Sequence, residues 1–301
     1  MKKTVSLFIV IAIYTAVIAQ QEGYITSQFS RIHYRTFGNG NPVLIINGGP
    51  GMNSDGFVGL AKELSGNNQT IIYDQRGTGQ STLSRTDNTS ITMALMAQDL
   101  EILREYLKID QWTILGHSFG GMLASYYTSY YPQHVRSLIL SSSGGIDLEL
   151  QSYVSKKLNA RLSRAEQDSL NYWNAKISGG DTSYHARLQR GKALAPAYVY
   201  DRENIPVIAE RLTQGNSIIN NLVWQDLQKI NFDCSKQLSG FKKPVLIIQG
   251  KEDIIEERTA EKAHAILSNS KIVLIDKCVH YGWLDAPTAY YGEVKKFLRD
   301  Q

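Results

Sequence analysis

The sequence is poor in cysteine, in net charge and in long apolar runs. Two cysteines, Cys234 and Cys278, are too few for a disulfide framework or a four-cysteine zinc site; an exported protein could pair them, but we interpret them as free core thiols. The formal net charge of +4, from 32 basic and 28 acidic residues, is too small to indicate nucleic-acid binding. A single apolar run of more than ten residues excludes a polytopic membrane protein. The remaining composition, 43% hydrophobic, is typical of a globular chain.

Motifs for cofactors and metals are also missing. The glycines of Gly77-Thr78-Gly79 follow an apolar run, but Thr82 stands where a dinucleotide-binding fingerprint requires a third glycine. No H-E-x-x-H pattern or cluster of cysteine and histidine indicates a metal site. We therefore expect neither a cofactor nor a metal ion.

The one long apolar run lies at the N-terminus and resembles an export signal. Lys2 and Lys3 precede an apolar stretch over residues 5–19, which is shorter than the roughly 20 residues of a spanning helix. We predict that residues 1–19 are a signal peptide and that the protein is periplasmic or secreted, without a stable membrane anchor; an uncleaved anchor helix is the alternative. Finding Met1 at the N-terminus of the protein in a cytosolic fraction would contradict this prediction.

Short apolar runs rich in β-branched residues recur along the rest of the chain. They predict buried strands over residues 42–46, 70–73, 112–115, 137–140, 244–248 and 271–275. Apolar residues at helical spacing predict helices over residues 91–107, 121–131, 259–267 and 288–298. Alternating patterns over residues 24–38 predict a leading antiparallel hairpin. This alternation of strands and helices indicates an α/β fold with a mostly parallel, doubly wound sheet.

One segment interrupts the alternation. Residues 147–240 contain no convincing buried strand and are polar and helix-prone. We predict a helical cap over residues 147–240, inserted into a core formed by residues 20–146 and 241–301.

The clearest chemical motif is G-x-S-x-G at residues 116–120. It stands between the predicted strand 112–115 and a predicted helix, which is the context of a nucleophile elbow. Such a strained turn exposes Ser118, and the N-terminus of the following helix offers free N–H groups to a developing anion. A glycine-rich turn with an incidental serine is the alternative, which the flanking strand and helix disfavour. We expect His117 to be structural and to point away from the site.

A nucleophilic serine needs a general base and an acid that orients the base. In this architecture the chain order is serine, acid, histidine. Asp253 follows the strand 244–248 and is preferred over its neighbour Glu252, while Asp276 is a weaker rival at the end of the next strand. His280 follows that last strand and is the predicted base. The predicted catalytic residues are therefore Ser118, Asp253 and His280.

An acyl-transfer reaction also needs two donors for the oxyanion of its tetrahedral intermediate. One is the backbone N–H of Phe119, the residue after the nucleophile. The second is expected from the loop N-G-G-P-G at residues 47–51, which follows the first core strand. Gly49 is the best candidate there, because Pro50 has no N–H to donate.

Three sequence blocks, at residues 47–51, 74–81 and 116–121, together resemble the proline iminopeptidases of the α/β-hydrolase superfamily. The resemblance extends over the chain from residue 20 and implies an α/β-hydrolase fold with an inserted helical cap. It implies a cofactor-free serine hydrolase that releases an N-terminal residue, usually proline, from short peptides. It also implies architectural roles for Asp74 and Arg76. A carboxylesterase or lactonase acting on small acyl esters is the alternative, and a binding protein that lost catalysis is disfavoured because all three catalytic candidates are present.

The chain departs from this family at two positions, with Asn47 where the family usually has histidine and Val279 where it usually has glycine. Members of the family bind the free α-amino group of the substrate through cap glutamates. Glu203 and Glu210 are the best available pair, because a helix would place both on one face. Asp226 is a rival, and a role as solvated surface acids is the alternative for the pair.

Overall fold

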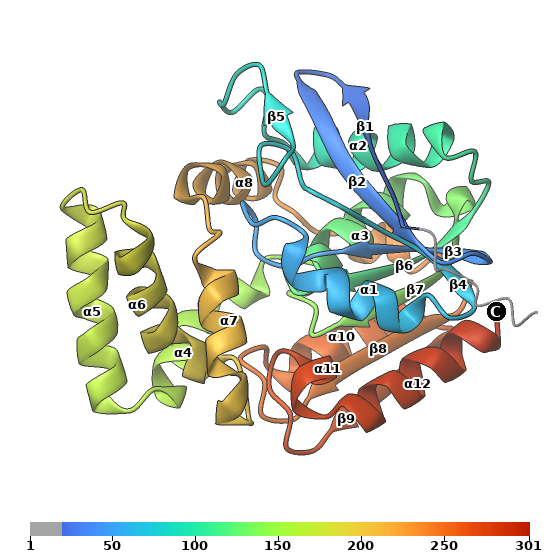
Figure 1. Ribbon diagram of the computed structural model, residues 1–301. Helices are drawn as coiled ribbons and strands as arrows, with labels where there is room; N and C mark the ends of the chain where they lie inside the picture. Colours follow the sequence, from blue (N-terminus) through green and yellow to red (C-terminus); the bar gives the residue numbers. More distant parts are fainter. Residues whose placement is uncertain (1–19) are drawn as a thin grey trace, which may run out of the picture.

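The computed structural model describes residues 20–301, so the predicted signal peptide lies outside the described residues. A nine-stranded sheet runs through the molecule in the order β1-β2-β4-β3-β6-β7-β8-β9, with β5 paired to β2 (Figure 1). The strands are β1 (Gln21–Ser27), β2 (Ser30–Phe37), β3 (Asn41–Ile46), β4 (Asn68–Tyr73), β5 (Thr82–Leu83), β6 (Trp112–His117), β7 (Val135–Ser141), β8 (Val245–Gly250) and β9 (Ser270–Ile275).

The pairing follows the hydrophobic pattern of the sequence. Strands β3, β4, β6, β7, β8 and β9 are mutually parallel, and β1 and β2 form the antiparallel hairpin predicted for residues 24–38. All six predicted core strands are confirmed. The two-residue strand β5 was not predicted, because it has too few residues to show a periodicity.

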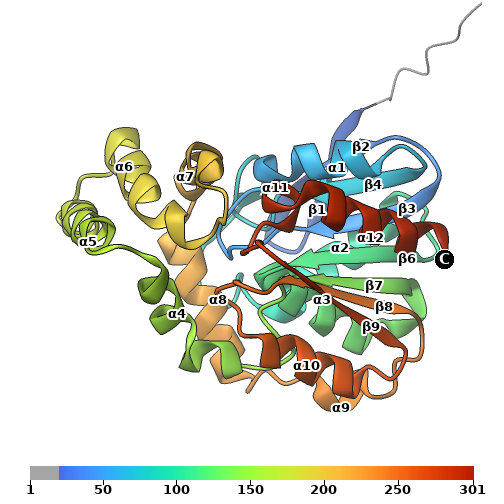
Figure 2. The same ribbon diagram turned by 90° about the horizontal axis from the view of Figure 1, so that it is seen from below.

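Helices cover both faces of the sheet (Figure 2). One face packs against α2 (Met93–Tyr106), α3 (Phe119–Tyr130), α9 (Ser235–Leu238) and α10 (Glu257–Ile266), and the other against α1 (Val58–Leu64) and α12 (Pro287–Arg299). Side chains alternate between the two faces along β3. Leu44 and Ile46 pack in the hydrophobic core under the first group of helices, and Val43 and Ile45 pack in the core under α1 and α12. The four predicted helices are confirmed. Helix α1 and the four-residue helices α9 and α11 (Gly282–Asp285) were not predicted, because they are too short to show a helical periodicity.

Residues 154–229, which lie between β7 and α9, form helices that stand beyond one end of the sheet (Figures 1 and 2). They are α4 (Val154–Arg161), α5 (Arg164–Ser178), α6 (Tyr184–Leu194), α7 (Ile205–Leu212) and α8 (Ser217–Lys229). Polar residues begin three of them: Ser163 forms a capping box with Glu166 at α5, Ser183 caps α6 and Asn216 caps α8. We refer to α4–α8 as the cap helices.

The loop after β4 is fixed by buried charges. Arg76 donates two hydrogen bonds to Asp99 of α2, at 2.8 and 2.7 Å, and both side chains are buried. Asp74 accepts hydrogen bonds from the backbone N–H groups of Ser54 and Gln80, both at 2.9 Å. These contacts are the architectural ones that the sequence resemblance implied. Within residues 20–301, no helix is long and apolar enough to cross a membrane.

Candidate active site

The turn between β6 and α3 carries Ser118 in a strained backbone conformation, with φ of 55° and ψ of −122°. Such a conformation costs a non-glycine residue about 1–3 kcal/mol, and the surrounding structure must impose it. A Cβ added to Gly120 would lie 2.1 Å from the carbonyl oxygen of Ile46, and one added to Gly116 would lie 2.4 Å from that of Gly120. The two glycines therefore let α3 begin directly against the ends of β3 and β6.

The loops after β8 and β9 meet beside this turn. His280 Nδ1 lies 2.9 Å from Asp253 Oδ1, and both side chains are buried. A carboxylate accepts from Nδ1–H, so Nε2 of His280 is left as the basic nitrogen. Asp253 Oδ1 also accepts the N–H of Ile255 at 3.1 Å, which fixes the carboxylate in its loop.

The two rival acids have other partners. Glu252 accepts the backbone N–H of Cys278 at 3.1 Å. Asp276 is exposed and forms an ion pair with Lys251 at 2.7 Å. Asp253 is thus the acid of the three that contacts His280.

His117 is not turned away from the site, and this prediction was wrong. Its ring centroid lies 4.7 Å from that of His280 and 4.8 Å from that of Trp283. Side chains alternate between the two faces along β6, so His117 lies on the same face of the sheet as Leu115. The segment around His280 packs against this face, which brings the two histidine rings together. Burial holds the pKa of His117 well below its usual value, with His280 and Arg211 lowering it further, so this ring is neutral near pH 7.

The loop after β3 contacts Ser118 through Gly48. A Cβ on Gly48 would lie 2.7 Å from Cβ of Ser118, so the loop backbone is in contact with the serine. Gly49 has a φ of +73°, which glycine adopts without strain. Phe119 is the first residue of α3, and its N–H therefore has no partner within the helix. The structure places both expected oxyanion donors in segments that flank Ser118.

The cap is hydrogen-bonded to both loops that carry the acid and the base. Arg161 of α4 donates from Nη1 to the carbonyl of Glu252 at 2.8 Å and from Nε to that of Ala197 at 2.9 Å. The N–H of His280 donates to the carbonyl of Tyr198 at 3.1 Å. The cap segment at residues 197–198 therefore bridges the loops of Asp253 and His280.

Asp285 makes a second connection of the same kind. One carboxylate oxygen accepts the N–H groups of Val279 and Tyr200, each at 2.9 Å. Asp285 and Arg161 were not predicted from the sequence. Their partners are backbone groups of other segments, and only the fold brings these groups to them. Neither residue stands in a recognisable motif, and Asp285 is the last residue of α11.

The cap acids proposed from the sequence do not contact the catalytic residues. Glu203 and Glu210 are both exposed, and Glu210 accepts a hydrogen bond from Tyr184 of α6. Asp226 is buried, but it accepts the N–H of Met93 at 2.8 Å and so stabilises the start of α2. Glu203 lies in a short 3-10 helix at Arg202–Asn204, and Glu210 lies in α7, which begins at Ile205. The two glutamates therefore do not share the single helix that the prediction assumed.

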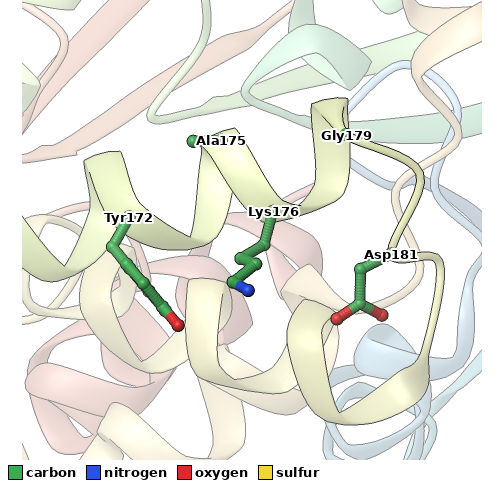
Figure 3. A pocket seen from close by; sticks show the side chains of 5 residues that line it. All are labelled: Tyr172, Ala175, Lys176, Gly179 and Asp181. Carbon is green, nitrogen blue, oxygen red and sulfur yellow. The ribbon is translucent and has the colours of Figure 1, made fainter.

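Cys234 and Cys278 are free and buried, and burial raises the pKa of Cys234 to about 12. No group of three or more potential metal ligands occurs within residues 20–301. A hollow of about 420 Å³ lies along the C-terminal half of α5, where it is lined by Tyr172, Lys176 and Asp181 among others (Figure 3). It contains none of the predicted catalytic residues.

Comparisons with known proteins agree with this architecture. The sequence model of the family described as alpha/beta hydrolase fold matches residues 41–287. A proline iminopeptidase from Heyndrickxia coagulans is 28% identical over 92% of this chain and 98% of its own length. A proline iminopeptidase from Lactobacillus acidophilus is 27% identical over 88% of this chain and 94% of its own. The solved structure of an esterase from Exiguobacterium antarcticum superimposes with a TM-score of 0.73 at 19% identity, covering 93% of this chain and all of that one.

The contact between Gly120 and Ile46 predicts a large effect of Gly120→Ala. The added Cβ meets backbone oxygens that cannot rotate away, so we expect a loss of about 3 kcal/mol in the free energy of unfolding. Displacement of the elbow should also slow the labelling of the protein by a fluorophosphonate. Urea denaturation followed by circular dichroism measures the first effect, and gel fluorescence of a tagged probe the second.

Gly59→Ala is the matched control, because nothing lies within 4 Å of a Cβ at this exposed position in α1. Alanine should there be neutral or stabilising by up to about 1 kcal/mol. Equal stability and equal labelling of the two variants would show that the close approach at Gly120 does not shape the site.

Proposed function

Because this chain belongs to the alpha/beta hydrolase fold family, we propose that it is a cofactor-independent serine hydrolase. Ser118 is the nucleophile, His280 the general base and Asp253 the acid that orients the base. The observation that carries the proposal is the buried 2.9 Å contact between His280 and Asp253, in the loops next to the strained serine turn.

The proposed reaction proceeds through an acyl-enzyme. Ser118 Oγ attacks the carbonyl carbon of the substrate while His280 Nε2 takes the hydroxyl proton. The C–N or C–O bond to the leaving group then breaks, and His280 gives the proton to that group. Water, deprotonated by the same nitrogen, releases the acid and restores Ser118. The N–H groups of Phe119 and Gly49 stabilise the oxyanion, and each donor contributes about 3 kcal/mol in related sites.

For the substrate, we propose the N-terminal residue of a short peptide, with proline preferred. The three sequence blocks at residues 47–51, 74–81 and 116–121 and the two relatives named proline iminopeptidase support this choice. Both relatives align over nearly the whole of their own length, so the cap region is included in the match.

A small acyl ester is the second candidate, and the cap acids favour it. A cationic amine taken out of water needs a carboxylate partner, since an unpaired ammonium costs several kcal/mol. Glu203 and Glu210 are exposed, and Asp226 is occupied by the start of α2. The neighbouring structure named an esterase has the same overall fold.

Three chromogenic substrates separate the candidates: proline p-nitroanilide, N-acetylproline p-nitroanilide and p-nitrophenyl acetate. An aminopeptidase should show a kcat/KM for the free amine at least about 100-fold above that for the acetylated analogue, equivalent to about 2.7 kcal/mol. Hydrolysis without protein is subtracted for each compound. Similar rates on both prolyl compounds, with faster turnover of the acetate ester, would contradict the aminopeptidase proposal and support the esterase.

A further inference from the structure

The peptide group between Gly48 and Gly49 has two donors on its carbonyl oxygen. Arg211 Nη2 of α7 lies 2.9 Å from this oxygen, and Asn47 Nδ2 lies 3.1 Å from it. The N–H of the same peptide group is that of Gly49, the proposed oxyanion donor. Hydrogen bonds in a chain polarise one another, and a charged donor has the larger effect. A guanidinium on the carbonyl therefore makes this N–H a stronger donor.

Arg211 is a buried cation without an ionic partner among the described residues. Its side chain is 4% exposed, and it lies over the ring of Phe57 with its guanidinium carbon 4.7 Å from the ring centroid. Buried charges are ordinarily paired with an opposite charge. The positive potential of Arg211 is thus not cancelled by an adjacent carboxylate, and it reaches the site, since it contributes to the lowered pKa of His117.

The cap also fixes the position of the same loop. Besides the bond to Gly48, Arg211 Nη1 lies 3.5 Å from the carbonyl oxygen of Asn53. Asn220 Nδ2 donates to the carbonyl of Pro50 at 3.1 Å, and the N–H of Asn216 donates to that of Gly51 at 2.9 Å. Four carbonyl groups of the loop therefore accept hydrogen bonds from the cap. The donors are Arg211 of α7, Asn220 of α8 and Asn216, which caps α8.

We propose that Arg211 is a positioning residue through which the cap orients and polarises the Gly48–Gly49 peptide, so that the strength of the oxyanion hole depends on the cap. The inference rests on the proposed function, because it takes the N–H of Gly49 as an oxyanion donor. The Gly49 N–H stabilises an oxyanion whose charge develops only on the way to the tetrahedral intermediate. Removal of the Arg211 side chain should therefore lower kcat and leave KM nearly unchanged.

The test uses Arg211→Ala and Arg211→Lys, with Arg187→Ala as the matched control at an exposed arginine of α6. Each is assayed on whichever of the three chromogenic substrates the wild-type protein hydrolyses fastest. Removal of a whole oxyanion donor costs about 100- to 1000-fold in kcat, so we expect about a 10- to 100-fold loss for Arg211→Ala with KM within threefold. Inhibition by phenylboronic acid, which forms an anionic tetrahedral adduct with a serine, should weaken by a similar factor. Arg211→Lys should retain more activity, and Arg187→Ala should match the wild type.

Chemical rescue distinguishes this role from a merely structural one. Millimolar guanidinium should raise the activity of Arg211→Ala at least fivefold. Urea, which has a similar planar shape without the charge, should not raise it. Activities are divided by the concentration of sites that react with a fluorophosphonate, so that misfolded protein does not count.

The inference is overturned if Arg211→Ala keeps kcat within twofold of wild type. It is also overturned if urea restores the activity of Arg211→Ala as well as guanidinium does, or if the substitution changes KM alone. Failure of the proposed function looks different, because the wild-type protein itself would then neither hydrolyse the three substrates nor react with the fluorophosphonate.

Discussion

The close approach of three backbone segments, at the ends of β3 and β6 and the start of α3, is the constraint on which the site depends. Gly120 lies against the carbonyl of Ile46, and Gly116 lies against that of Gly120. No side chain fits at either contact. With the helix held there, Ser118 occupies a strained conformation in the turn, and it is half-buried at the edge of the sheet. The same approach brings Gly48 into contact with the serine, so one packing contact positions both the nucleophile and the oxyanion loop.

The parallel sheet supplies the remaining groups. The carboxyl ends of parallel strands lie at one edge, so the loops after β3, β6, β8 and β9 converge. Asp253 and His280 are 27 residues apart in the chain and meet because β8 and β9 are neighbours in register. The cap is hydrogen-bonded to three of these loops, through Arg211, Arg161 and the carbonyl of Tyr198. Cap and core are therefore mechanically linked at the site.

Sequence patterns predicted the parts of the structure that local periodicity and chain order determine. Apolar runs located the core strands, and G-x-S-x-G between a strand and a helix located the elbow. The order of acid and histidine after the serine selected Asp253, which the structure pairs with His280. The missing parts depend on tertiary packing. The position of His117 follows from which face of β6 the last loop covers, and the exposure of Glu210 from how α7 packs on the core. Arg161, Arg211 and Asp285 bind backbone groups, which have no sequence signature.

The central claim is that Ser118 is the nucleophile, and covalent labelling by a fluorophosphonate tests it most directly. Intact mass spectrometry of the treated wild-type protein should show a single adduct, and peptide mapping should place it on Ser118. Ser118→Ala should remain unlabelled under the same conditions, with circular dichroism and urea denaturation showing that it is folded. An adduct on folded Ser118→Ala, or a wild-type adduct on another residue, would contradict the account.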